Sequence, residues 1–230
     1  MIGIYVITLV FAGIGMFVQW RLKSKFQKYS EVGLRNGLSG KEIAEKMLRD
    51  NNIFDVRILS VEGQLTDHYN PTDKTVNLIP DVYHGRHASA AAVASHECGH
   101  AVQHAVAYSM LQFRSAMVPV LNIANNFMPI ALMVGMMILY STGNRLVLMV
   151  GVVMFALATL FSFITLPVEF DASRRALAWM ESKNVVTAEE QTMAKDALWW
   201  AAMTYVAAAL GMLAQLLYYV SLLSGRRSND

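Results

Sequence analysis

Four long apolar runs restrict the fold of this chain more than any other feature. They cover residues 2–18, 117–140, 146–166 and 198–223. Inside a bilayer every backbone N–H and C=O group must be hydrogen-bonded within the protein, so apolar runs of this length are expected to form membrane-spanning helices. The mean hydropathy of +0.36 and the 16% of charged residues agree with this interpretation. The sequence therefore predicts a mainly α membrane protein with about four transmembrane helices.

Basic residues after the first apolar run predict the orientation of the chain. Arg21, Lys23, Lys25 and Lys28 follow that run closely, whereas a cleaved signal peptide would carry its positive charges before it. By the positive-inside rule, the N-terminus lies outside and the next segment lies in the cytoplasm. The predicted segments are a first transmembrane helix at 1–18, a cytoplasmic portion at 19–116, a transmembrane hairpin at 117–166, a cytoplasmic helical segment at 167–197, a fourth transmembrane helix at 198–223 and a tail at 224–230. The basic residues of the tail depart from the charge rule.

The first cytoplasmic portion has the pattern of a small α+β unit. Ser39 and Glu42 form a capping-box pattern that predicts the start of a helix. Three short strand-like runs follow at 54–61, 64–69 and 74–79, separated by turn residues. We predict a small antiparallel sheet, in which the run 74–79 is an open edge that binds extended substrate by strand addition.

The second cytoplasmic segment is predicted to contain two helix starts. Pro167 suits the first turn of a helix that begins at the membrane surface. Thr187 and Glu190 form another capping-box pair, which precedes the helix that leads into the last apolar run. Both helix starts would lie on the same side of the membrane as the α+β unit.

A metal-binding pattern lies on an alanine-rich run between residues 88 and 108. His96, Glu97 and His100 form the sequence H-E-x-x-H, and the run contains small residues and no proline, as a buried helix requires. On a helix the two histidines lie about 40° apart and one turn along the axis, so both can bind one ion. Zinc accepts imidazole nitrogen, and a neighbouring carboxylate can take a proton from the water that zinc activates. We therefore predict one catalytic Zn²⁺ with Glu97 as the general base.

A catalytic zinc site usually has a third protein ligand, and several residues could supply it. His84, His87 and His104 are candidates, as are acidic residues on the same side of the membrane. Glu169 is preferred, because the hairpin at 117–166 returns the chain to that side just before it. The alternative is that Glu169 only complements the dipole at the N-terminus of a helix.

Three residues are candidates for binding the substrate carbonyl or the developing oxyanion. They are His84, Tyr83 and Arg174. His84 and His87 could instead form a second site, or be polar loop residues. Cys98 lies about 200° around the helix from the first motif histidine, so it should face away from the metal as a small buried apolar residue.

A family resemblance rests on two segments, VYHGRHASAAAVASHECGHAVQHA and LPVEFDASRRA. Together they resemble the bacterial integral-membrane neutral zinc metallopeptidases of the YugP type, and the resemblance covers nearly the whole chain. It implies a membrane-embedded zinc endopeptidase with His96, His100 and Glu169 as ligands and Glu97 as catalytic acid and base. The arrangement is similar, more distantly, to the prenyl-protein proteases and heat-shock membrane proteases, which pair H-E-x-x-H with a downstream E-x-x-x-D helix.

The chain departs from the E-x-x-x-D pattern at one position. Four residues after Glu169 stands Ser173 instead of an aspartate. Asp171 is an acid nearby, but its spacing from Glu169 places it on another face of the helix. Ser173 and Asp171 are therefore both candidates for orienting a ligand histidine.

These patterns predict an enzyme that hydrolyses peptide bonds near the cytoplasmic membrane surface. Its partners would be a polypeptide substrate and the lipid bilayer of the bacterial inner membrane, whereas a net charge of +2 argues against nucleic acid. A non-catalytic, zinc-stabilised scaffold or chaperone is the alternative, and it would not need Glu97 beside an open coordination position. A transporter is disfavoured, because no internal repeat is visible.

Overall fold

The computed structural model describes residues 2–63 and 66–225. Within this range the chain forms two compact units. Unit 1 comprises Met1–Phe17, Phe113–Leu166 and Tyr205–Asp230, and unit 2 comprises Val18–Gln112 and Pro167–Thr204.

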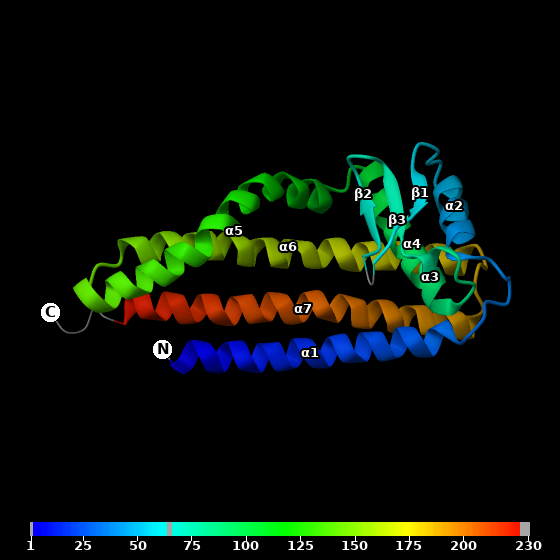
Figure 1. Cartoon of the computed structure of the whole chain (residues 1–230). Helices are drawn as coiled ribbons and strands as arrows, with labels where there is room; N and C mark the ends of the chain where they lie inside the picture. Colours follow the sequence, from blue (N-terminus) through cyan, green and yellow to red (C-terminus); the bar gives the residue numbers. More distant parts are fainter. Residues whose placement is uncertain (1, 64–65, 226–230) are drawn as a thin grey trace. The chain divides into compact units, whose positions relative to one another are not determined.

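Four helices are long and apolar enough to cross a membrane, as the apolar runs predict. They are α1 (Ile2–Ser30), α5 (Ser109–Thr142), α6 (Leu146–Ser182) and α7 (Ala188–Ser224), and each is a long coiled ribbon in Figure 1. Each of the four contributes residues to both units. A mainly helical fold with four candidate membrane helices is thereby confirmed.

Glycines allow helices to approach closely in unit 1. A Cβ atom added at Gly135 of α5 would lie 2.5 Å from the backbone of Leu148 in α6. One added at Gly151 of α6 would lie 2.9 Å from the backbone nitrogen of Leu132. Such small residues let backbones meet where lipid provides no hydrophobic force between helices.

Helix α6 differs from the prediction at Pro167. We predicted that a new helix begins there, but α6 runs without interruption from Leu146 to Ser182 with Pro167 inside it. Proline removes one backbone donor and usually bends or ends a helix. Here the following turns carry Val168, Ala172 and Ala176, all with 0% exposure. Packing of this stripe in unit 2 stabilises the continued helix and offsets the cost of the proline.

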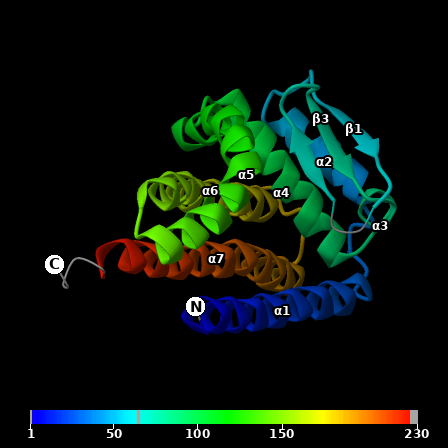
Figure 2. The same ribbon diagram turned by 60° about the vertical axis from the view of Figure 1, so that its left-hand side comes forward.

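The sheet of unit 2 has three strands, and its order differs from the prediction. The strands are β1 (Arg57–Ser60), β2 (His68–Asn70) and β3 (Thr75–Leu78), and their order is β1-β3-β2. All three strands are labelled in Figure 1, and Figure 2 shows β1 beside β3 from another side. β3 pairs with β2 in antiparallel fashion and with β1 in parallel, so the predicted purely antiparallel sheet is wrong. Residues 64–65 of the predicted second strand lie outside the described residues.

The position of β3 also removes the predicted open edge. All four residues of β3 are buried, and the strand has a partner on each side. A strand hydrogen-bonded on both sides has no free row of backbone groups for an added peptide. Strand addition at 74–79 is therefore excluded, and β1 and β2 are the edges of this sheet.

Both predicted capping boxes are confirmed. In α2 (Gly40–Asp50), the Ser39 hydroxyl accepts from the N–H of Glu42, whose carboxylate accepts from the N–H of Ser39 at 2.7 Å. At the start of α7, the Thr187 N–H donates to Glu190 at 2.7 Å, and the Glu190 N–H donates to the Thr187 hydroxyl at 3.2 Å. Each box satisfies backbone donors that have no partner within the helix.

Helix α4 (Ala88–Ala105) is the buried centre of unit 2. His87 caps it, because Nδ1 of this residue accepts from the N–H of Ala90 at 3.2 Å. α4 follows the short helix α3 (Pro80–Tyr83) and packs against α2. A Cβ atom at Gly99 would lie 2.5 Å from the carbonyl oxygen of Ala172, so α4 and α6 meet backbone to backbone at a point that accepts only glycine.

Candidate metal centre

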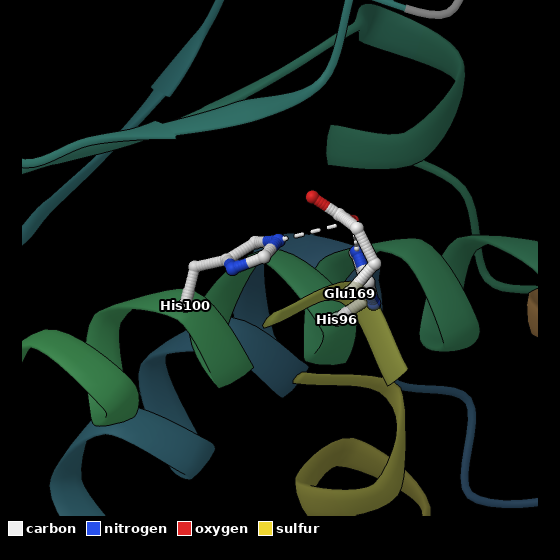
Figure 3. Close-up of side chains that lie close together, drawn as sticks. All are labelled: His96, His100 and Glu169. Atoms are coloured by element: carbon white, nitrogen blue, oxygen red, sulfur yellow. Dashed lines mark ion pairs between the residues drawn. The ribbon is translucent and has the colours of Figure 1, made fainter. Parts of the chain in front are cut away.

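Three side chains that could bind a metal ion lie close together in unit 2. Nε2 of His96 and Nε2 of His100, both on α4, lie 3.3 and 3.5 Å from Oε2 of Glu169 on α6. Figure 3 shows the three side chains pointing toward one another from the two helices. Their side chains are 14, 11 and 4% exposed, respectively. Among the described residues, this is the only cluster of three or more His, Cys, Asp or Glu that could hold a metal ion.

The spacing of these atoms fits a zinc ion. Ligand atoms about 2.0–2.1 Å from a tetrahedral ion lie about 3.3 Å from one another. The two measured nitrogen–oxygen distances are 3.3 and 3.5 Å, and the three ligand atoms all lie within 4.8 Å of one another. Two imidazole nitrogens and one carboxylate oxygen also make the donor set of many catalytic zinc sites, which keep a fourth position for water. The residues present therefore fit this metal.

Hydrogen bonds fix the ring of His100 in the tautomer that a metal requires. Gln103 Nε2 donates to the carbonyl of Val168 at 2.8 Å and to Asp171 Oδ2 at 2.9 Å. Because both partners are acceptors, the amide orientation is determined, and its Oε1 is the atom 3.0 Å from Nδ1 of His100. A carbonyl oxygen only accepts, so Nδ1 carries a proton, and Nε2 is the nitrogen of this ring that could bind a metal ion.

His96 is contacted by a different group, a hydroxyl on helix α6. Ser173 Oγ lies 3.1 Å from Nδ1 of His96. The serine that departs from the E-x-x-x-D pattern thus contacts a candidate ligand directly, whereas Asp171 contacts the other one only through Gln103. Of the two side chains of α6 that the sequence suggested as orienting groups, Ser173 therefore lies against the ring of His96, and Asp171 is linked to the ring of His100 by Gln103.

Glu97 lies beside the ligand cluster without being part of it. Its exposure is 8%, and its Oε2 accepts a hydrogen bond from the backbone N–H of Tyr69 at 3.0 Å. Asp67 precedes β2, and burial raises the pKa of its carboxyl to about 6, with a further contribution from the negative charge of Glu97. Two acids with different environments therefore lie on this side of α4.

The other candidate residues have different surroundings. Tyr83 and His84 pack edge to face with ring centroids 4.8 Å apart, and Lys41 Nζ lies 5.6 Å from the centroid of the Tyr83 ring. Arg174 is highly exposed and pairs with Asp171. Among the described residues, neither His84 nor His87 belongs to the His–His–Glu cluster.

Cys98 is in the position that the helix geometry predicts. Its exposure is 0%, and its Sγ lies 3.7 Å from the carbonyl oxygen of Ala44 in α2. Burial raises the pKa of the thiol strongly, so the side chain is neutral. Cys98 therefore acts as a small apolar residue in the contact between α4 and α2.

Comparison with known proteins agrees with this geometry. A family model described as "Putative neutral zinc metallopeptidase" matches residues 4–224. The chain belongs to this family. It is also similar to the "Putative membrane protease YugP" of Bacillus subtilis (strain 168), with 41% identity over 224 residues, which make up 97% of this chain and 98% of that protein. No solved structure matches the chain significantly.

Membership of the neutral zinc metallopeptidase family confirms the resemblance found in the sequence. The family description supports zinc as the metal, and the geometry of unit 2 supplies a group that could hold it. The sequence reasoning missed Gln103, although a signal was present. This amide stands three residues after His100 on the same helix face, so its side chain can reach the ring of that histidine.

Proposed function

We propose that this protein is a membrane-embedded zinc endopeptidase, with His96, His100 and Glu169 as ligands of one ion and Glu97 as general base. The observation that supports this most directly is the spacing of the three ligand atoms, 3.3 and 3.5 Å between nitrogen and oxygen, with an acid next to the first histidine in the sequence. The substrate would be a polypeptide, cleaved close to the lipid bilayer.

The side chains of unit 2 suggest how hydrolysis would proceed. Zinc held by the three ligands would supply a Lewis acid that lowers the pKa of a coordinated water. The Glu97 carboxylate would accept a proton at the oxygen that does not bind the Tyr69 N–H, and would later give that proton to the leaving amine of the cleaved peptide. Ser173 and Gln103 would hold the two imidazole rings in position throughout.

The rival function, a zinc-stabilised scaffold or chaperone, would require a different number of protein ligands and no general base. A structural zinc site is closed by four protein ligands and needs no base. In the described residues the cluster has three members, and Glu97 is adjacent to it.

Removal of metal by a chelator, followed by addition of zinc, should abolish and then restore cleavage of a polypeptide. A protein that cleaves equally well after the metal is removed would contradict the proposal.

We propose that the metal site faces the cytoplasm, because the basic residues after the first apolar run should stay inside. The single cysteine, Cys98, is buried, so introduced cysteines can be labelled against a low background. Ser60 and Thr142 are both exposed and lie in different units. In intact cells, an impermeant maleimide is expected to label Thr142→Cys but not Ser60→Cys. Labelling of Ser60→Cys would overturn this orientation and the inner-membrane topology built on it.

The residues that orient the ligand histidines should affect metal affinity moderately. We expect Ser173→Ala and Gln103→Leu each to weaken zinc binding by about 10–100-fold, because each change frees one imidazole ring from its partner. Asp171→Ala, which acts only through Gln103, should have an effect within the same range or below it. Competition with a fluorescent chelator measures the affinity.

The matched control for Ser173→Ala is Ser182→Ala on the same helix, since Ser182 bonds only the carbonyl of Trp179 among the described residues. Its zinc affinity should equal that of the wild type. Equal affinity in Ser173→Ala as well would show that this hydroxyl does not orient His96.

A further inference from the structure

Tyr69, in the middle of β2, touches α4 at two points. Its backbone N–H donates to Oε2 of Glu97 at 3.0 Å. Its hydroxyl lies 2.8 Å from Nδ1 of His104, and the two rings are tilted with centroids 5.8 Å apart. One residue of an edge strand therefore contacts both the candidate base and a second side chain of the metal-binding helix.

The spacing on α4 explains how one residue can reach both partners. Glu97 and His104 are seven residues apart, which is almost two helical turns, so they lie about 20° apart on one face and about 10 Å apart along the axis. The backbone of Tyr69 contacts the first position and its long side chain extends to the second. β2 has only three residues and is paired with β3 on one side, so these contacts attach its other side to α4.

The pairing of β2 shows which backbone groups are available on that side. In an antiparallel pair, alternate residues direct their N–H and C=O groups toward the partner strand and away from it. Tyr69 is opposite Val76, and its N–H bonds Glu97 instead of β3. A displacement of β2 would therefore remove a donor from the Glu97 carboxylate directly.

We propose that Tyr69 and His104 are positioning residues for Glu97: their hydrogen bond holds β2 against α4, so that the Tyr69 N–H fixes one carboxylate oxygen and leaves the other to accept the proton. This inference rests on the proposed peptidase function. A glutamate side chain has three rotatable bonds, and a general base must be within hydrogen-bond reach of the proton it removes. His104 acts through Tyr69 and, among the described residues, is not a member of the ligand cluster.

The attachment itself can be tested without any enzymatic assay. Hydrogen–deuterium exchange of the β2 segment is measured by mass spectrometry on the full-length protein in detergent. Tyr69→Phe and His104→Leu should each raise the exchange rate of this segment about five- to tenfold, because each removes one hydrogen-bonding group. His104→Asn should retain most of the protection, since its amide reaches the position of Nδ1. Unchanged exchange in Tyr69→Phe and His104→Leu would overturn the proposal.

The matched control is Tyr108→Phe, which also removes a phenol in unit 2. The Tyr108 ring lies 5.8 Å from the Arg175 guanidinium, and its hydroxyl has no hydrogen bond among the described residues. Exchange of the β2 segment in this variant should equal that of the wild type. Increased exchange in the control would show that loss of any nearby hydroxyl loosens β2, and would overturn the specific role of Tyr69.

Kinetics with dye-labelled casein separates positioning from substrate binding. Tyr69→Phe and His104→Leu should lower kcat about three- to tenfold with KM and zinc content unchanged, and His104→Asn should restore most of kcat. A raised KM with unchanged kcat would overturn the proposal and assign Tyr69 to substrate binding. Glu97→Gln, measured alongside, distinguishes failure of the proposed peptidase mechanism from failure of the positioning role. If Glu97→Gln cleaves as well as the wild type, the peptidase mechanism is wrong. If Glu97→Gln is inactive but Tyr69→Phe has normal kcat, only the positioning role is refuted.

Discussion

Glu97→Gln is expected to retain bound zinc but to hydrolyse polypeptides slower than the wild type by about 10³-fold or more. The amide has almost the volume of the carboxylate and can keep the hydrogen bond with the Tyr69 N–H, so the local structure should persist. It cannot accept a proton from water near neutral pH. Zinc content is measured by elemental mass spectrometry on the purified protein, and activity by cleavage of dye-labelled casein.

Glu45→Gln provides the matched control for this change. Glu45 lies on α2, where it forms an exposed pair with Lys41 at 3.6 Å, and its side chain is 44% exposed. Such pairs contribute little to stability, so the control should have wild-type zinc content and activity. If Glu97→Gln also kept wild-type activity, Glu97 would not be the base, and the scaffold alternative would gain support.

Glu169→Gln is expected to lose most of its bound zinc and with it all cleavage. Oε2 of Glu169 is the atom shared by both nitrogen–oxygen distances in the cluster, and the side chain is 4% exposed. The substitution keeps the volume of the side chain but replaces an anionic ligand by a neutral amide that binds zinc poorly. Zinc stoichiometry after dialysis against a weak chelator is the primary measurement, because it does not depend on the substrate.

Glu181→Gln on the same helix is the control for the ligand assignment. Glu181 is exposed and does not belong to the ligand cluster, so this variant should hold one zinc as the wild type does. One tightly bound zinc and normal cleavage in Glu169→Gln would show that the assignment is wrong. His84 and His104 would then be the next residues to test, although His104 is already bonded to Tyr69.

The sequence correctly predicted those structural features that depend on residues close together in the chain. The capping boxes at Ser39 and Thr187 form as expected, because their hydrogen bonds join residues only three apart. The apolar runs correspond to helices long enough to cross a membrane, since length and composition alone determine that property. The H-E-x-x-H residues lie on one helix, where the spacing of the motif brings both imidazole rings together.

The features that the sequence did not reveal depend on distant contacts. The order of the strands depends on which of the three strands is fully buried. All four residues of β3 are buried, and β3 is the central strand. The continuation of α6 through Pro167 depends on burial of a stripe against the rest of unit 2. The link from His100 to Asp171 depends on a hydrogen bond between Gln103 and Asp171, which are 68 positions apart, so no local pattern predicts it.

The glycine between Glu97 and His100 bears on how the proposed site would acquire its metal. Gly99 brings the α4 backbone against the carbonyl of Ala172, three residues after Glu169, so the gap between the ligand atoms is set by two helices in direct contact. Zinc fingers, in contrast, gather their ligands only when the ion arrives, and metal binding drives their folding. In the site that we propose, the packing of α4 against α6 already brings the three side chains together, so the entropic cost of gathering them is met when the chain folds. We therefore expect the protein to be folded before zinc binds, so that the binding free energy of zinc is not spent on ordering the chain.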